Sequence, residues 1–270
     1  MILLLLRILT GYRISVSVLL SQTKSILHMF TSQHSDFILT PLKNILEEGM
    51  CASRAVGDGI ETYPMGEYLM QALFLKLTGA QEQKMKCICW DLATNDYEYR
   101  YEYLNRKNYK ECSSYTDKNG IFNDLILAIK KVDDGFEPSS IIDEEFLASF
   151  LKDMLKLYTS SVMSTWKHKE FCYFESEVSS VLDIKQLQYN KSVKYSLFQS
   201  KLQDFYEKVV YRHRNRCAHN TLSYQVNKPD LSVLSSADYD YHSYFFRYAI
   251  IILIDEMFIK LFEKYLSLKK

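Results

Sequence analysis

One short segment gathers the side chains best suited to phosphate chemistry. Arg212, Arg214 and Arg216 fall within five residues, and His213 and His219 lie among them. An arginine carries a permanent charge and a planar fork of N–H groups that fits phosphate oxygens. Histidine is the side chain best poised to move a proton near neutral pH. Together these residue types can cleave RNA without a metal: histidine deprotonates the ribose 2′-OH or protonates the leaving 5′-oxygen, and arginine stabilises the charge on the phosphorane.

Basic charge is concentrated around this segment. Residues 191–220 hold seven Lys or Arg and two acidic residues, a local net charge of +5, whereas the whole chain has 33 residues of each sign and no net charge. A neutral chain is not one that coats nucleic acid through its whole surface, but a local basic patch can still bind a phosphate backbone. We expect Lys208, Arg212 and Arg216 to contact the backbone of an RNA.

The segment also resembles a known family. Arg214-Asn215-Arg216-Cys217-Ala218-His219 is similar to the Arg-(Asn/Asp/His)-x-x-x-His motif of HEPN domains, which are widespread in prokaryotic toxin–antitoxin, abortive-infection and CRISPR-associated systems. Arg214 matches the arginine of the motif, Asn215 the polar residue that follows it, and His219 the histidine. The resemblance implies an α-helical bundle, a homodimer with a composite active site at its interface, and metal-independent endoribonuclease activity.

Some assignments around the motif stay open. A looser form of it admits Arg212 in place of Arg214, with six residues before the histidine. Some members of the family carry an acidic residue upstream, for which Glu207 is the candidate orienting residue. Arg214 and His219 would also suit the end of a helix simply because cations are favoured there by the helix dipole. We interpret His213 as a helix-surface residue.

The remaining sequence predicts helices that would position this segment. With 47% apolar residues, only 8 Gly and only 4 Pro in 270 residues, the composition favours an all-α unit over a turn-rich β fold. A helix is predicted from Lys194 to about Cys217, on the basis of an apolar stripe formed by Phe198, Leu202, Phe205, Tyr206, Val209 and Val210. Further helices are predicted over 41–48, from 64 onward, and over 81–92, 122–132, 142–160 and about 238–268. Thr40 is the expected N-cap of the first of these helices, and Gly49 is its expected end. The strongly apolar stretch Tyr248–Ile254 is expected to be a core helix, and Asp255 after it to be solvated or paired with the arginine cluster.

Breaks and loops are predicted from local signals. Thr78–Gly79 is expected to break or kink a helix, Lys118–Gly120 to form a turn, and residues 220–236 to form a loop. Residues 96–103 alternate charged and aromatic side chains, which is typical of a half-buried strand. We nevertheless favour a helix there, because no convincing partner strand is evident.

The chain is expected to consist of one main domain and a short N-terminal segment. We expect an N-terminal helical appendage over residues 1–35 and one HEPN-like all-α domain, a helical bundle with extra helices, over residues 36–270. The apolar run of residues 1–20 is interrupted by Arg7 and Arg13 and is shorter than the ~20 clean residues of a membrane span. A buried or docking helix is the preferred interpretation, and a membrane-associated or cleaved segment is the alternative. A membrane partner is therefore not expected, and the cytoplasm is the expected compartment.

No metal or cofactor is predicted. Cys87 and Cys89 form a C-x-C without a second pair at metal-ligand spacing, so the six cysteines are interpreted as ordinary reduced thiols. The sequence lacks a glycine-rich phosphate loop and a hydrolase serine motif.

Three hypotheses follow for the chain as a whole. The first is a HEPN-type endoribonuclease that acts as a defence or toxin effector on an RNA such as tRNA or mRNA, with an antitoxin or sensor as a further partner. The second is a non-catalytic helical module that binds RNA, a nucleotide or a regulatory partner through the same basic cluster. The third is a membrane-associated effector that docks on lipid through residues 1–20 and 243–254.

Overall fold

The computed structural model describes residues 33–57, 59–105, 111–191, 194–219 and 241–269; within these ranges, the side chains of residues 33, 60, 188–191, 194 and 219 are not described. The chain divides into two compact units, Met1–Phe37 and Ile38–Lys270, and the fold below is that of the second. The predicted loop over 220–236 and the apolar run of residues 1–20 lie outside the described residues, as does most of the predicted appendage over 1–35.

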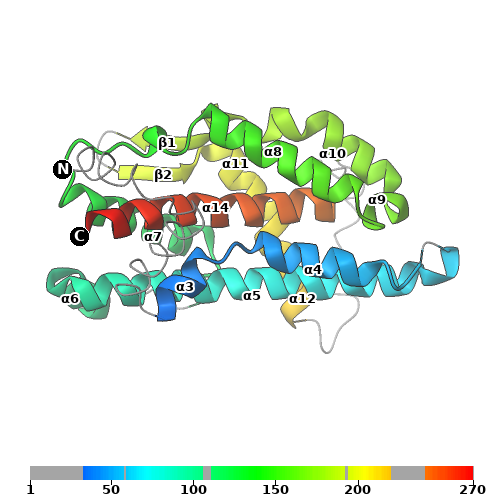
Figure 1. The fold of residues 1–270 in the computed structure, drawn as a ribbon, viewed down its shortest axis with the longest axis horizontal. Helices are drawn as coiled ribbons and strands as arrows, with labels where there is room; N and C mark the ends of the chain where they lie inside the picture. Colours follow the sequence, from blue (N-terminus) through cyan, green and yellow to red (C-terminus); the bar gives the residue numbers. More distant parts are fainter. Residues whose placement is uncertain (1–32, 58, 106–110, 192–193, 220–240, 270) are drawn as a thin grey trace, which may run out of the picture. The chain divides into compact units, whose positions relative to one another are not determined.

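The described residues are all-α apart from one hairpin (Figure 1). The α-helices are α3 (Gln33–Leu39), α4 (Lys43–Ser53), α5 (Tyr63–Asn95), α6 (Tyr97–Asn105), α7 (Tyr115–Lys130), α8 (Glu144–Thr159), α9 (Met163–Trp166), α10 (His168–Val181), α11 (Ser200–Phe205), α12 (Arg212–His219) and α14 (Tyr244–Leu268). Short 3-10 turns are η1 (Ile60–Thr62), η2 (Pro138–Ser140) and η3 (Ile184–Gln186), and a π-helical segment, η4 (Tyr206–Tyr211), joins α11 to α12. The predicted all-α class is confirmed.

Helix α14 forms the centre of the second unit. Every residue from Tyr244 to Asp255 is buried, and α14 contacts α5, α7, α8 and α10. Figure 1 shows it running between a layer that contains α8 and α10 and a layer that contains α4 and α5. A helix that is apolar on all sides must be covered on all sides. The prediction that this strongly apolar stretch is a core helix is therefore confirmed.

Helix α5 is continuous over 33 residues, about 50 Å at 1.5 Å per residue. The predicted break at Thr78–Gly79 is wrong. The Thr78 hydroxyl donates back to the carbonyl oxygens of Phe74 and Leu75, both at 3.1 Å, a bond that a threonine inside a helix can make. Gly79 lies in the helix interior, where packing against neighbouring helices overrides its low helix propensity. The length of α5 allows a single rod to contact α4, α7, α12 and α14.

Two other predicted boundaries are also wrong because tertiary contacts replace the expected local ones. Helix α4 begins at Lys43 and continues through Gly49, and its first free N–H, that of Leu42, donates to Asp255 Oδ2 at 2.7 Å. Asp255 on α14 thus caps α4 in place of the expected Thr40. Residues 118–120 lie inside α7, which begins after the N-cap Ser114.

The prediction that a helix begins at Lys194 is wrong, because a β-hairpin occupies this part of the chain. Strands β1 (Leu187–Lys191) and β2 (Lys194–Phe198) pair antiparallel, with Leu187 opposite Phe198 and Lys191 opposite Lys194. Helix α7 fixes the hairpin: Asn119 Oδ1 accepts a hydrogen bond from the Leu197 N–H at 2.7 Å, and Tyr115 bonds both backbone groups of Phe198. The helix that leads to the basic segment therefore starts at Ser200.

Two further predictions concern α6 and the membrane. Residues 97–105 are helical, so the choice of helix over strand for the alternating tyrosines is confirmed. Among the residues that the structure describes, no helix is both long enough and apolar enough to cross a bilayer.

Candidate functional site

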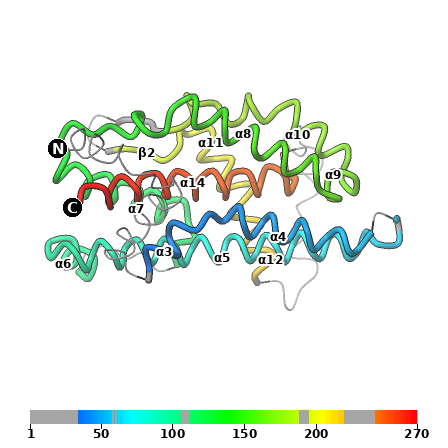
Figure 2. Tube along the Cα trace, in the orientation of Figure 1, coloured from blue at the N-terminus to red at the C-terminus, as the bar shows by residue number. Residues whose placement is uncertain are grey.

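The basic segment is reached through the π-helical segment η4. Tyr206, Val209 and Val210 of η4 are buried and anchor it to the core. The Tyr206 hydroxyl donates to the Ser113 carbonyl at 3.1 Å, and the buried guanidinium of Arg247 on α14 donates through Nε to the Val209 carbonyl at 3.1 Å. Short π-helical insertions occur frequently at functional sites. Helix α12 follows η4 directly and packs against α5 (Figure 2).

His213 anchors α12 to the core. Its ring lies 4.9 Å from that of Phe74 and 5.4 Å from that of Tyr244, and Nε2 is 3.3 Å from the Tyr244 hydroxyl. Burial above all, together with the positive charges of Arg247 and Arg216, lowers the pKa of His213 to about 2. The interpretation of His213 as a helix-surface residue is therefore wrong. This imidazole is neutral and cannot serve as a general acid near pH 7.

Arg214 forms a two-pronged ion pair with Glu82 of α5. Its Nε donates to Oε1 of Glu82 and its Nη2 to Oε2, both at 3.1 Å. The two side chains are 20% and 10% exposed, respectively. Such a fork fixes the plane of the guanidinium as well as its position. The arginine that matches the motif is thus oriented from a helix 132 residues away in sequence.

Asn215 lies beside this pair. Its Oδ1 is 3.4 Å from Nη1 of Arg214, on the side of the guanidinium that Glu82 does not occupy. This placement suits the orienting role expected of Asn215. His219 is the last residue of α12, about 7.5 Å along the helix axis from Arg214 at 1.5 Å per residue. Its side chain is not among those described.

The other basic residues differ in their surroundings. Arg212 is exposed, and Arg216 is partly buried with Nη2 3.4 Å from Nδ1 of His213. Burial lowers the pKa of Arg216. Lys208 is exposed and pairs at 3.5 Å with Asp204, one helical turn earlier. Arg212 and Lys208 therefore reach solvent, as backbone-contacting residues must, whereas Arg216 also helps to hold His213.

The acid that orients the arginine was missed by sequence reasoning. Glu207 accepts a hydrogen bond from Nε2 of Gln203 at 3.1 Å, and the carboxylate that binds Arg214 is that of Glu82. No local signal identifies Glu82, because it lies in the middle of a long helix with no motif around it. Only the packing of α12 on α5 brings the two residues together.

Asp255 is neither exposed to solvent nor paired with the arginine cluster, contrary to expectation. It is buried on α14, where it pairs with Nζ of Lys84 at 2.7 Å and caps α4. Lys84 donates a further short hydrogen bond to the Thr40 carbonyl. This charged pair is closed on every side and belongs to the core.

The described residues offer little for metal chemistry. They contain no group of three or more His, Cys, Asp or Glu side chains arranged to hold an ion. All six cysteines lie in the described part and none forms a disulfide. Cys87 is partly buried and Cys89 is buried, and burial raises the pKa of the Cys87 thiol.

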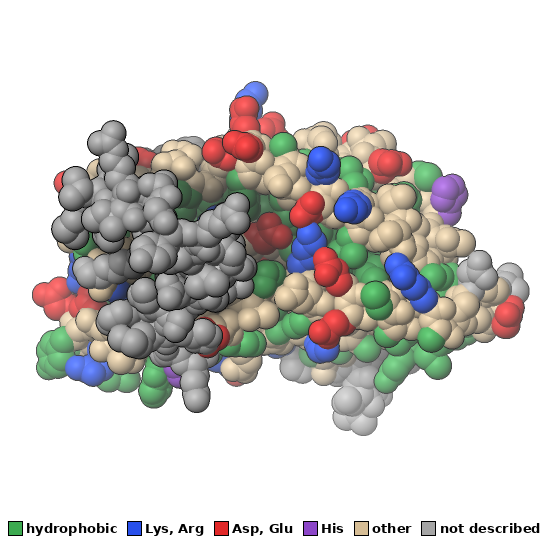
Figure 3. Space-filling view, viewed as in Figure 1, with side chains coloured by type: hydrophobic (Ala, Val, Ile, Leu, Met, Phe, Trp, Pro, Cys, Tyr) green, Lys and Arg blue, Asp and Glu red, His purple; other side chains and the backbone are tan. Residues whose placement is uncertain are grey.

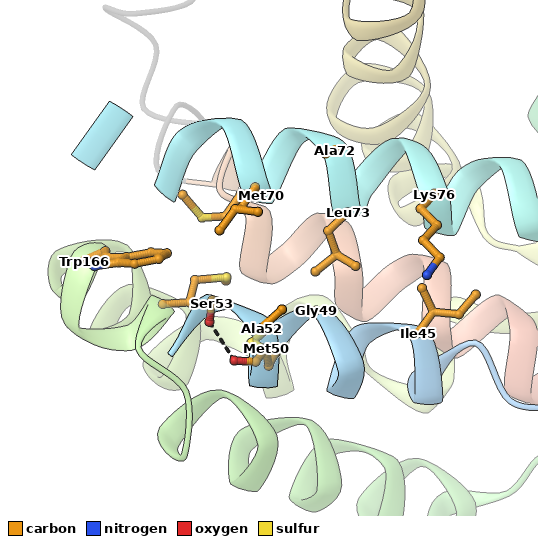
Figure 4. Close-up of a pocket in the computed structure, with 12 residues that line it drawn as sticks. Ile45, Gly49, Met50, Ala52, Ser53, Met70, Ala72, Leu73, Lys76 and Trp166 are labelled. Carbon is orange, nitrogen blue, oxygen red and sulfur yellow. Dashed lines mark hydrogen bonds between the residues drawn. The ribbon is translucent and has the colours of Figure 1, made fainter. Parts of the chain in front are cut away.

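A hollow of about 200 Å³ lies between α4 and α5 (Figure 4). Leu73, Met70 and Ile45 line it, Trp166 closes one end, and Lys76 supplies a charge. The Ser53 hydroxyl at its edge already donates to the Met50 carbonyl at 2.7 Å. This lining lacks the convergent polar groups that catalysis requires.

Charge on the face seen in Figure 3 is mixed. Acidic and basic side chains of the described residues are interspersed over it without one continuous patch of either sign. Compared with protein-family models, curated proteins and solved structures, the chain matches none. The geometry of α12 and its neighbours therefore carries the functional argument.

Proposed function

We propose that this protein is a HEPN-type, metal-independent endoribonuclease that acts as a defence or toxin effector in the cytoplasm. The supporting observation is the fork between Glu82 and Arg214, with the amide of Asn215 beside it. A guanidinium held in one plane at the edge of the protein is prepared to bind the phosphate of a scissile bond. A surface arginine without such a fork would not be held in one orientation for a phosphate.

The hydrogen-bond inventory of Arg214 leaves room for a phosphate. A guanidinium has five N–H donors. Glu82 takes one on Nε and one on Nη2, and Asn215 lies near one on Nη1. Neither Glu82 nor Asn215 takes the other two donors of the guanidinium. Arg214 would use them to bind the phosphate and to stabilise the charge that develops on it.

His219 would move the protons in this mechanism. It would deprotonate the ribose 2′-OH or protonate the leaving 5′-oxygen, and 2′-OH attack would give a 2′,3′-cyclic phosphate and a 5′-hydroxyl. One histidine per chain is few for two proton transfers. We therefore propose a homodimer in which two copies of α12 face one shared site across a two-fold axis. Arg212, Arg216 and Lys208 would bind the RNA backbone on either side.

A binding module without catalysis is the second candidate, and one observation favours it. Arg214 is already paired, and His213 is neutral and engaged with Tyr244. These two residues could thus serve only to attach α12 to the core, leaving a basic surface that holds RNA, a nucleotide or a regulatory partner. Salt-dependent binding of RNA without any product would support this candidate.

The deciding experiment measures cleavage in the absence of metal. Purified protein is incubated with total RNA, and separately with tRNA, in EDTA, beside His219→Ala and His168→Ala. His168 is an exposed histidine on α10 and serves as the matched control. We expect His219→Ala to lose roughly 10²–10⁴-fold in rate and His168→Ala to lose nothing. Undiminished cleavage by a folded His219→Ala variant would refute the assignment of His219.

A further inference from the structure

A buried arginine on α14 has no acidic partner among the described residues. Arg247 is 5% exposed, and its Nε donates to the Val209 carbonyl at 3.1 Å. Its Cζ also lies over the ring of Tyr244, 5.1 Å from the centroid. A guanidinium has five N–H donors, so the four others find no acceptor in the described part of the chain. A charge that has lost its hydration without an ion pair or a full set of hydrogen bonds is costly.

The acidic residues on the neighbouring α5 and α10 are engaged by a different cation. Nζ of Lys167, which lies between α9 and α10, is 3.7 Å from Glu170 and contacts Glu67 more closely still. Burial lowers the pKa of Arg247 to about 10, and the carboxylate of Glu170 opposes this fall less than Tyr244 does. Arg247 therefore stays charged near pH 7, and no ion pair with a described residue cancels its charge.

A second arginine joins the same group of residues from α12. Nη2 of Arg216 is 3.4 Å from Nδ1 of His213, and Nε2 of that ring is 3.3 Å from the hydroxyl of Tyr244. Arg247 lies against the ring of this tyrosine. No carboxylate in the described ranges forms an ion pair with Arg216. Two arginines are thus connected through one His–Tyr pair, and their like charges are not balanced by any described acid.

The hydrogen bonds of this pair leave a further donor. A guanidinium can only donate, so Nδ1 of His213 accepts from Arg216 and the hydrogen of the neutral ring is on Nε2. Nε2 lies 3.3 Å from the Tyr244 hydroxyl and 3.5 Å from Sγ of Cys217. Because Nε2 carries a hydrogen, the tyrosine hydroxyl can accept from it but cannot donate to it. The O–H of Tyr244 is therefore left to donate to another acceptor, as are the N–H groups of Arg247.

We propose that Arg216, Arg247 and the hydroxyl of Tyr244 form an anion site that takes a phosphate group, separate from the phosphate that Arg214 would hold. Arg214 is bound to Glu82 of α5, whereas this site lies where α12 meets α14. A phosphate has several charged oxygens, which can accept from both guanidinium groups and from the hydroxyl while balancing their charge. The use of this site for a second phosphate of the RNA rests on the proposed function, but the site itself does not require cleavage.

The first measurement is thermal unfolding of the full chain in increasing inorganic phosphate, beside sodium chloride at matched ionic strength. A ligand that binds only the folded state raises the midpoint with its concentration, and the rise gives an apparent dissociation constant. We expect phosphate to stabilise the wild type more than chloride does. Arg247→Gln keeps a neutral donor for the Val209 carbonyl but carries no charge. Its dissociation constant for phosphate should rise about tenfold or more, which is the worth of a charged hydrogen bond.

Two other variants separate binding from folding. Arg216→Gln changes a partly buried residue and should lose the phosphate response to a similar extent, so it decides the matter if Arg247→Gln does not fold. Arg54→Gln is the matched control, because Arg54 is an exposed arginine that donates through Nη2 to the Ser160 carbonyl at 3.2 Å. It should respond to phosphate like the wild type. A wild type that phosphate stabilises no more than chloride, or an undiminished response in Arg216→Gln, would overturn the proposal.

A second measurement tells an RNA phosphate from free phosphate. A fluorescently labelled RNA with 2′-O-methyl groups cannot undergo 2′-OH attack, so its anisotropy in EDTA reports affinity alone. If the site holds a phosphate of the RNA, Arg247→Gln and Arg216→Gln should bind this RNA about tenfold more weakly, and inorganic phosphate should compete with it. Unchanged RNA affinity in both variants would overturn the use of the site for RNA. A phosphate response in a protein that cleaves no RNA would refute the proposed function and leave the anion site established.

Discussion

Replacing His213 by glutamine should change how the stability of this protein depends on pH. In the folded state burial lowers the pKa of His213 to about 2, whereas an unfolded chain takes up a proton near pH 6.5. Below pH 6.5 the unfolded state therefore binds a proton that the folded state does not. The free energy of unfolding consequently decreases as the pH is lowered. From linkage, this group costs about 2 kcal/mol between pH 7 and pH 5. Any folded-state pKa below about 4 gives the same figure, so the prediction does not depend on the exact shift.

The assay is urea unfolding of wild type and His213→Gln at pH 7, 6 and 5. Glutamine keeps a donor and an acceptor near Tyr244 but cannot be protonated in this range. The variant should be the less stable protein at pH 7, and its deficit should shrink by about 2 kcal/mol at pH 5. Carboxylates with raised pKa, such as Glu170 and Asp255, titrate in both proteins and cancel in the comparison. A deficit that stays constant across the range would show that the pKa of His213 is not lowered in the folded protein, and would refute its role as a neutral anchor of α12.

Two further predictions concern α5 and use the same unfolding measurement. Gly79→Ala should raise stability by about 0.5–1 kcal/mol, because a Cβ there meets no atom within 4 Å and the helix is continuous; a loss would mean that the chain does break at this residue. Lys84→Met should lower stability by about 3–5 kcal/mol, because it leaves Asp255 as an unpaired buried charge. The combination of Lys84→Met with Asp255→Leu should recover much of that loss, and equal destabilisation by the single and double variants would contradict the reasoning.

Helices that bury one broad face could be predicted from the sequence. The stretch at 142–160 carries apolar residues at helical spacing and forms α8, and the strongly apolar stretch near 250 forms the central α14. Boundaries failed where a contact distant in sequence replaced the local signal. The N-terminus of α4 is capped by Asp255 instead of Thr40, and the strand β2 exists because Asn119 and Tyr115 of α7 bind its backbone. Neither partner is visible in a local pattern.

The candidate site likewise contains residues that could be proposed from the sequence and residues that could not. Arg214, Asn215 and His219 lie within six residues and could be proposed from spacing alone. Glu82 belongs to α5, and it joins the group only through the packing of α12 on α5. The misinterpretation of His213 has the same origin, because the aromatic ring that buries it comes from Phe74 on α5. A motif contained in one segment can be proposed from its spacing, whereas the residues that contact it from other helices could not be predicted.

Two ion pairs on α5 show why the pair at α12 suits a ligand. Lys84 and Asp255 are 2% and 1% exposed, and their polar atoms are used within the protein to tie α4, α5 and α14 together. Arg214 is 20% exposed, and the outer edge of its guanidinium has donors that neither Glu82 nor Asn215 takes. A helix dipole favours cations near the end of α12 but does not require a fork to a carboxylate on another helix. Because a buried ion pair adds little stability for its desolvation cost, an open pair of this kind is better explained by the orientation that it gives Arg214.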